Sequence, residues 1–158
     1  MIFNNRMTAR MEGDFAVFLI GMRINRPLMV HKWLPVAQAM PAMLKELYSK
    51  PELGLLSHEM WFSRTIILVQ YWRSLDALLD YATSKESAHL PAWQRFNKAI
   101  GNDGSVGIWH ETYLSGNGNY ENIYVNMPRF GLGKAGLLVE AKSGLRSASG
   151  RMKGNTSE

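Results

Sequence analysis

Two histidines, His89 and His110, frame a stretch of the sequence that combines aromatic side chains with a glycine-containing turn. His89 directly precedes "LPAWQRF", and His110 lies within "SVGIWHETYL". A neutral imidazole is a common axial ligand of haem iron, and an imidazole that titrates near neutrality can take up or release a proton during catalysis. His89 is therefore a candidate haem-iron ligand, and His110 is a candidate catalytic acid or base.

The residues that follow His89 have helical spacing. His89, Trp93, Phe96 and Ile100 fall at positions i, i+4, i+7 and i+11, so they would share one apolar face of a helix. A proline disfavours helical geometry in the residue before it, so Pro91 can instead place His89 just ahead of the helix. In both cases Trp93 and Phe96 are candidates for contact with a cofactor.

His110 lies in the middle of an expected strand over residues 105–114. Alternation along a strand puts His110 on one face with Ile108 and Thr112, while Trp109 and Glu111 take the other face. If the face of His110 lies under the helices, both imidazoles point into the layer between helices and sheet. Lined by Trp, Phe, Met and Leu, such a layer could form a cofactor cavity.

Each of these residues also has a structural interpretation. A histidine in a small protein is commonly an exposed or internally satisfied residue, and two histidines without a third ligand do not make a zinc site. Arg23, at the end of a buried strand, can anchor a substrate carboxylate or a haem propionate. It can equally cap the sheet edge or pair with Glu59. We assign no role to His31 or His58.

The composition indicates one folded domain with an apolar interior. Hydrophobic residues make up 46% of the 158 residues, including ten Met and five Trp. No Cys is present, which excludes disulfides, thiolate metal sites and a Cys nucleophile. No apolar run approaches the roughly 20 residues that span a bilayer, and the first residues lack the apolar core of a signal peptide. We expect a cytoplasmic protein with no membrane partner.

The basic character of the chain is concentrated near its C-terminus. Residues 128–158 contain six basic and two acidic residues, so they carry +4 of the net charge of +5. No nucleic-acid-binding motif accompanies this segment, and we do not expect a nucleic-acid partner. We expect a folded domain over 1–127 and a basic, Gly- and Ser-rich tail over 128–158, with one short helix near 134–142 in an otherwise mobile segment.

The order of expected elements predicts the fold. Strands are indicated at 14–25, 52–62, 65–72, 105–114 and 120–127, with helices over 35–49, after Ser74 and from near Pro91. Residues 14–25 are apolar on both faces, which indicates a central strand. Pro41 should kink or shorten its helix. The order is that of a ferredoxin-like βαββαβ unit of the α+β class, plus an extra strand.

A sheet with helices on one face needs a cover on the other. We expect this open face to carry Val17, Leu19, Leu68 and Trp72, which cannot all face water. A second copy of the chain would cover it, giving a homodimer with the architecture of a dimeric α+β barrel.

Several segments resemble a known family: "GDFAVFLIGMRIN", "KWLPV", "YWRSLDALLDYA", "HLPAWQRF" and "IWHETY" followed by "YENIYVNMPRFGLGKA". Together they are similar to a bacterial and fungal family of monooxygenase-like proteins, named after a fungal enzyme of fumagillin biosynthesis. The resemblance covers about residues 8 to 136. It implies the dimeric α+β barrel architecture and a monooxygenase-like oxidoreductase acting on a small apolar or aromatic substrate.

A more distant similarity is to the aldoxime dehydratases, which are haem enzymes. By this resemblance His89 matches their haem-ligating histidine and His110 matches their distal acid–base histidine. The chain is far shorter and shows no clear counterpart of their catalytic serine. Four alternatives stay open: a haem-dependent monooxygenase, a cofactor-independent monooxygenase, an aldoxime dehydratase-like haem protein, and a non-enzymatic dimer that binds an apolar ligand.

Overall fold

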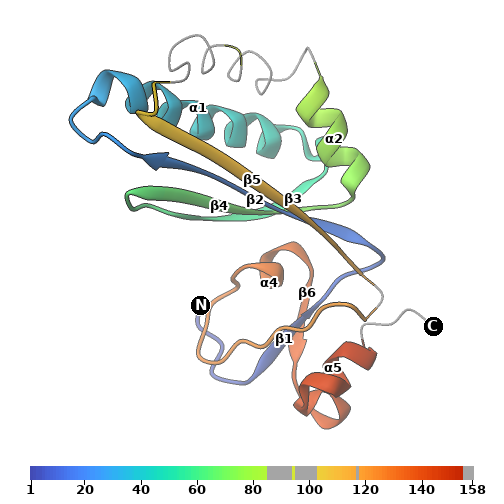
Figure 1. Ribbon diagram of the computed structural model, residues 1–158. Coiled ribbons are helices and arrows are strands. Elements are labelled where there is room, and N and C mark those ends of the chain that lie inside the picture. Colours follow the sequence, from blue (N-terminus) through green and yellow to red (C-terminus); the bar gives the residue numbers. More distant parts are fainter. Residues whose placement is uncertain (85–93, 95–102, 117, 155–158) are drawn as a thin grey trace.

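The computed structural model describes residues 1–84, 94, 103–116 and 118–154 (Figure 1). Its main sheet contains β2 (Phe15–Ile24), β3 (Leu55–Trp61), β4 (Thr65–Trp72) and β5 (Val106–Ser115). The strand order is β3-β4-β2-β5, with every neighbouring pair antiparallel. β2 is central, as its apolar residues on both faces predicted.

Of the described helices, α1 (Val30–Ser49) and α2 (Leu75–Thr83) cover one face of this sheet (Figure 1). The chain runs β2-α1-β3-β4-α2-β5, which is the ferredoxin-like order. The predicted α+β class is therefore confirmed. Within the single chain the sheet stays open, with β3 and β5 as its edges.

Helix α1 begins earlier than the sequence indicated and ends at the predicted Ser49. It begins at Val30, includes His31, and continues through both Pro35 and Pro41 to Ser49. Both prolines are exposed, so water can satisfy the backbone carbonyls that lose a helical partner. The opposite side of the helix buries Met43, Leu44 and Leu47 against the sheet.

Helix α2 has the predicted N-cap. The backbone N–H of Ala77 donates to Ser74 Oγ at 3.1 Å, and Asp76 stands in the first turn, where a negative charge is favourable. Leu78 and Tyr81 are buried. The helix expected from near Pro91 falls outside the described residues, apart from Gln94, which is helical and exposed.

The main core lies between these helices and the sheet. Leu68 and Trp72 belong to it, with only 2% and 1% of their surfaces exposed. The prediction that Leu68 and Trp72 lie on the open face was wrong. The register pairs Leu68 with Ile20 and Trp72 with Ala16, and directly paired residues share a face, so all four lie under the helices.

The opposite face of the main sheet carries Val17 and Leu19, as predicted, together with their cross-strand neighbours Tyr71 and Val69. Val17 and Tyr71 are covered by residues that lie far away in the sequence, packed around Leu132. Towards the other end of the same face, Trp61 keeps 46% of its surface exposed. We call this side of the main sheet the open face.

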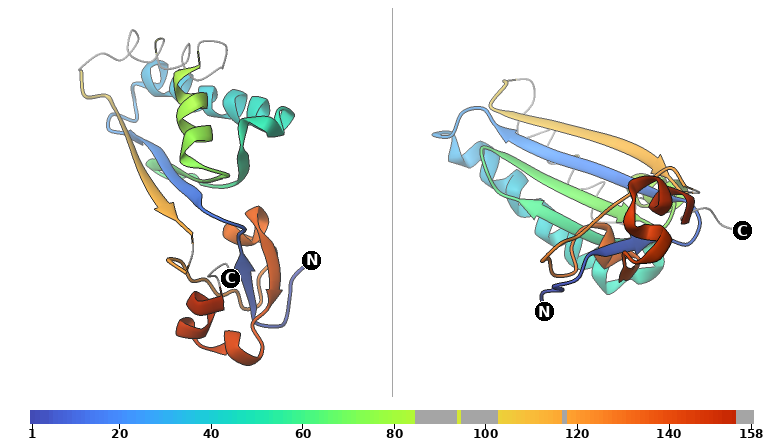
Figure 2. Two further views of the ribbon diagram at one scale, coloured as in Figure 1. Left: turned by 90° about the vertical axis from the view of Figure 1, so that its right-hand side faces the viewer. Right: turned by 90° about the horizontal axis from the view of Figure 1, so that it is seen from below.

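A second, two-stranded sheet lies beyond one end of the open face (Figure 2). It pairs β1 (Met7–Arg10) with β6 (Leu137–Glu140). The short helices α4 (Leu132–Ala135) and α5 (Ala148–Gly154) pack in the same region, and a 3₁₀ turn over Ser143–Arg146 precedes α5. Another 3₁₀ turn, over Pro51–Leu53, lies between α1 and β3. Both described ends of the chain therefore lie on this side of the main sheet.

The extra strand expected over 120–127 does not form. This segment makes only isolated bridges, Met7 with Tyr124 and Phe3 with Met127. Next to the Met7–Tyr124 bridge, the side chain of Asn122 bonds both backbone groups of Ala9: Oδ1 accepts from its N–H at 2.6 Å and Nδ2 donates to its carbonyl at 3.0 Å. A side-chain amide thus takes the place of strand pairing there.

The C-terminal segment is more ordered than the sequence indicated. The helix expected near 134–142 is the shorter α4, followed by β6 and later by α5. Arg151 is only 5% exposed, and its guanidinium bonds Glu121 and the carbonyls of Leu145 and Arg146. At least one basic residue of this segment is therefore structural. The domain division at residue 127 stays a prediction.

Candidate functional site

His110 lies on the helix side of the main sheet. It is directly paired with Ile20, whose side chain packs against the core under α1 and α2. The face of His110 therefore lies under the helices, which was the condition for its imidazole to point into the layer between helices and sheet. Its ring lies near that of Phe18, with centroids 5.6 Å apart. His110, Thr112 and Leu114 are exposed within the described chain, and they form the histidine strip on the helix side of β5.

A small apolar cavity of about 40 Å³ lies beside this strip, between the sheet and the two helices. Its walls are almost entirely aliphatic, aromatic or thioether groups. They are Phe18, Ile20, Met40, Met43, Leu47, Gln70, Trp72, Leu78, Tyr81 and Ala82. Phe18 belongs both to this wall and to the contact with His110, so it joins the cavity to the histidine strip.

Gln70 is the amide side chain in this wall, and it is 4% exposed. The indole N–H of Trp72 donates to Gln70 Oε1 at 3.0 Å. Both residues lie on β4 two positions apart, so both point towards the helices. Tyr81 completes the polar part of the wall, and its hydroxyl donates to Glu46 Oε2 at 3.3 Å. Burial, reinforced by the negative charge of Glu46, raises the pKa of Tyr81, which keeps the phenol protonated at neutral pH.

A tyrosine–histidine pair stands at the edge of the same layer. The Tyr48 hydroxyl lies 2.7 Å from His58 Nδ1, and their rings are 5.5 Å apart. His58 is directly paired with Gln70 across the strands, so it shares the helix side. Burial lowers the pKa of His58, and the positive charge of Lys134 lowers it further. Burial likewise raises the pKa of Tyr48.

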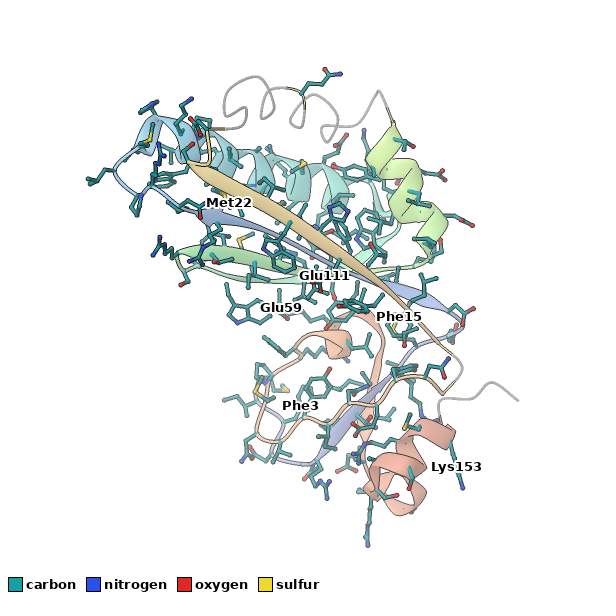
Figure 3. All side chains as sticks on the ribbon, in the orientation of Figure 1. Phe3, Phe15, Met22, Glu59, Glu111 and Lys153 are labelled. Carbon is teal, nitrogen blue, oxygen red and sulfur yellow. The ribbon has the colours of Figure 1, made fainter. Side chains whose placement is uncertain are left out.

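Arg23 does not share a face with His110. It is three positions beyond Ile20 on β2, so its exposed side chain lies on the open face, where Nη1 donates to Thr65 Oγ1 at 3.0 Å. Glu59, the alternative partner of Arg23, instead accepts from the backbone N–H of Gly131 and lies 2.8 Å from Lys134 Nζ. Figure 3 shows Glu59 below the sheet, towards α4.

The remaining predicted site residues, His89, Trp93 and Phe96, lie outside the described residues. Within the described part of the chain, no group of three or more His, Asp or Glu side chains could hold a metal ion. In the same part, no helix combines the length and apolar character needed to cross a membrane.

Residues 15–132 match the family described as Monooxygenase af470-like. The chain belongs to this family. The match spans the whole ferredoxin-like unit and ends at Leu132, the first residue of α4, so it includes the cavity wall and the histidine strip. Family membership confirms the resemblance seen in the sequence.

A curated relative, Monooxygenase af470 of Aspergillus fumigatus, is 29% identical over 137 residues, which cover 81% of this chain and 48% of the relative. This member of the Monooxygenase af470-like family thus spans about half the length of that relative. A crystal structure of aldoxime dehydratase superposes with a TM-score of 0.65 at 19% identity and covers 85% of this chain but 42% of that one. That likeness shows the shared fold.

A third similar structure is SnoaB, a cofactor-independent oxygenase from Streptomyces nogalater. It is 12% identical and superposes with a TM-score of 0.46 over 63% of this chain and 91% of its own.

Among the described residues, the histidine strip offers an imidazole that a haem could contact. Haem needs an axial imidazole or another ligand and an apolar slot of several hundred Å³. The enclosed cavity, at about 40 Å³, is too small for it. Over the strip, His110 offers an imidazole beside the apolar Phe18 and Ile20, and Leu114 is 65% exposed.

Sequence reasoning gave no role to Gln70 or His58. Gln70 interrupts the apolar run "TIILVQYW", and a lone amide in a buried strand is a usable signal, because a buried polar group needs a partner. His58 gave no such signal, since its contact with Tyr48 joins a helix to a strand and depends on how the two pack.

Proposed function

We propose that this chain is a monooxygenase that binds a small apolar or aromatic substrate on the helix side of its sheet, with His110 as the acid–base group. The placement of His110 carries the proposal. Its imidazole lies near the ring of Phe18, which lines the apolar cavity, and it is exposed on the helix side of the sheet. Membership of the Monooxygenase af470-like family supports the reaction class.

In the cofactor-independent form, the substrate itself supplies the electrons that reduce oxygen. His110 takes a proton from an acidic C–H group of the substrate, and the carbanion transfers electron density to O₂ as a C–O bond forms. The resulting hydroperoxide loses water and leaves a carbonyl group. The balanced reaction is R₂CH₂ + O₂ → R₂C=O + H₂O, in which carbon is oxidised and oxygen reduced. The protein contributes orientation and proton transfer.

In the haem-dependent form, His89 would hold the iron, and Trp93 and Phe96 would flank the porphyrin. Haem would supply the redox chemistry with oxygen. His110 would take up or release a proton of the substrate. The fold shared with aldoxime dehydratase and the exposed histidine strip support this form, and the same site could serve an aldoxime dehydratase-like reaction.

Titration of the purified protein with haemin distinguishes these two forms. A Soret band that forms with the wild type and with His31→Ala, but not with His89→Ala, would establish the haem form and its ligand. His31 is a suitable control because it is exposed on α1. An unchanged Soret band in His89→Ala would reject this ligand.

Oxygen uptake tests the cofactor-independent form. Anthrone is a suitable probe, because it is an aromatic ketone with an acidic methylene group. A colourless, metal-free sample should consume one O₂ for each anthraquinone formed, and His110→Gln should lose this activity. Equal uptake by both proteins would contradict the role of His110. A protein that binds anthrone but consumes no oxygen, with or without haem, would be a ligand-binding protein.

The active assembly in this proposal is a homodimer with two open faces packed together. This chain covers 48% of Monooxygenase af470 and 42% of the aldoxime dehydratase chain, which supports the dimer. A second copy of the chain could supply what the rest of each longer protein supplies. The exposed Trp61 and the half-buried Leu19 and Val69 on the open face support it too. Arg23 would then lie at this interface, where it could anchor a carboxylate.

Analytical ultracentrifugation tests the dimer. Leu19→Lys places a charge in the middle of the open face and should convert a dimer into a monomer. Gln38→Lys, which is exposed on α1, should leave the dimer intact. A monomeric wild type at micromolar concentration would contradict the proposal.

A further inference from the structure

We infer that Gln70 binds the substrate directly, by donating a hydrogen bond from its Nε2 group to an acceptor oxygen on an aromatic ligand. The inference deepens the proposed function and rests on it for the identity of the site. It assigns a ligand class, an aromatic ketone or phenol, to the cavity between the sheet and α1 and α2.

The orientation of the Gln70 amide is fixed by its neighbour. An indole N–H can only donate, so the Gln70 atom that lies 3.0 Å from Trp72 Nε1 must be the carbonyl oxygen. Trp72 is 1% exposed and packs against Tyr81, with ring centroids 5.7 Å apart, which holds the indole in place. The Nε2 group of Gln70 is therefore a donor with a set direction.

Gln70 Nε2 has no hydrogen-bond acceptor among the described residues, although Gln70 is 4% exposed and lines the cavity. A ligand oxygen in the cavity can accept a hydrogen bond from this group. An apolar ligand without such an oxygen cannot, so the cavity should distinguish the two.

The cavity wall favours a neutral acceptor. The ten described residues of the wall include no Asp, Glu, Lys, Arg or His, and the remaining polar group among them, the Tyr81 hydroxyl, already donates to Glu46. A carboxylate would lose its hydration here without gaining a cationic partner. A ketone or phenol oxygen needs only the single donor that Gln70 offers.

The position of Gln70 relative to His110 sets the length of the ligand. Gln70 is paired with Phe18, whereas His110 is paired with Ile20, so the two lie two strands apart with an offset of two residues. Strand spacing and rise give about 12 Å between their Cα atoms. Both side chains lie on the helix side, with Phe18 on the strand between them, so a ligand that contacts both must extend across Phe18.

The cavity receives one end of such a ligand. A volume of about 40 Å³ accepts an oxygen and a ring edge but not a whole fused-ring system. Met40 and Met43, which form part of the wall, can change rotamer to widen it. The rest of the ligand would cross Phe18 towards His110, with its acidic C–H group at the far end.

Binding under nitrogen tests this inference separately from catalysis. The probes are anthrone and 9,10-dihydroanthracene, which lacks the carbonyl, and equilibrium dialysis gives both dissociation constants. Wild type should bind anthrone about 10-fold more tightly than dihydroanthracene, since one hydrogen bond to a buried amide is worth about 1.4 kcal/mol. Gln70→Leu should remove this preference by weakening anthrone alone, and His110→Gln should keep it.

Trp72→Phe provides a second variant, because it keeps a ring in the core and releases the amide. It should retain part of the preference for anthrone, since the amide can then rotate. A wild type that binds anthrone no more tightly than dihydroanthracene would overturn the inference, and so would Gln70→Leu that keeps the wild-type preference. If the preference holds while His110→Gln still oxidises anthrone, the binding role of Gln70 stands and the proposed role of His110 fails.

Discussion

The rings of His110 and Phe18 lie with their centroids 5.6 Å apart and their planes tilted by 45°. They come from neighbouring strands, β5 and β2, and both project towards the helices. Phe18 also lines the enclosed cavity. This contact therefore connects the titratable His110 side chain, which a ligand can reach, with the apolar interior. A proton-transfer site for an apolar substrate requires this arrangement.

Gly21 should be sensitive to substitution by alanine. A Cβ atom there would lie 2.6 Å from Trp109 Nε1 and 2.7 Å from the backbone oxygen of Ile66, so the strand would have to move. We predict that Gly21→Ala lowers the free energy of unfolding by about 1–3 kcal/mol. Gly107→Ala is the matched control, because among the described residues its Cβ would meet no atom closer than 3.7 Å. Urea denaturation measures both, and equal stability of the two variants would contradict the packing of Trp109 over Gly21.

The stability of the protein should fall in mild acid because of His58. Its pKa is lowered in the folded state by burial, so the unfolded chain takes up the proton first as the pH falls. The contribution of neutral His58 is present above its ordinary pKa of about 6.5 and is lost below it. We predict a smaller loss of stability between pH 8 and pH 5 in His58→Gln than in wild type. Urea midpoints at the two pH values would show this, and identical losses would refute it.

Arg151 should be essential to the C-terminal segment. It is 5% exposed and bonds Glu121, whose side chain is 28% exposed, together with two backbone carbonyls. Because Glu121 is partly solvated, we predict that Arg151→Ala costs about 2–3 kcal/mol, below the range for a fully buried pair. Lys45→Ala, at an exposed position on α1, removes the same charge and should change stability little. Thermal unfolding of both variants checks the difference, and an unaltered midpoint in Arg151→Ala would show that the segment is not held by this residue.

The sequence predicted those elements whose signals are local. The two-sided apolar run of β2 indicated a central strand, Ser74 indicated a helix start, and alternation in β5 put His110 opposite Glu111. The α+β class followed from the order of the elements. These signals depend only on neighbours in the chain.

The features that the sequence did not reveal depend on contacts between distant segments. β4 is apolar at nearly every position, so alternation could not show that Leu68 and Trp72 face the helices. Residues 120–127 alternate like a strand, yet Asn122 binds the backbone of Ala9, more than a hundred residues away. The donor role inferred for Gln70 depends on its contact with Trp72, and in a strand sequence nothing distinguishes such a pair from ordinary packing.

The proton transfer assigned to His110 can be measured directly, without oxygen or turnover. In D₂O under nitrogen, NMR follows the exchange of the anthrone methylene hydrogens for deuterium. The account predicts that wild type and His31→Gln accelerate this exchange equally and that His110→Gln loses about 100-fold or more of the acceleration. An exchange rate in His110→Gln equal to that of wild type would contradict the account.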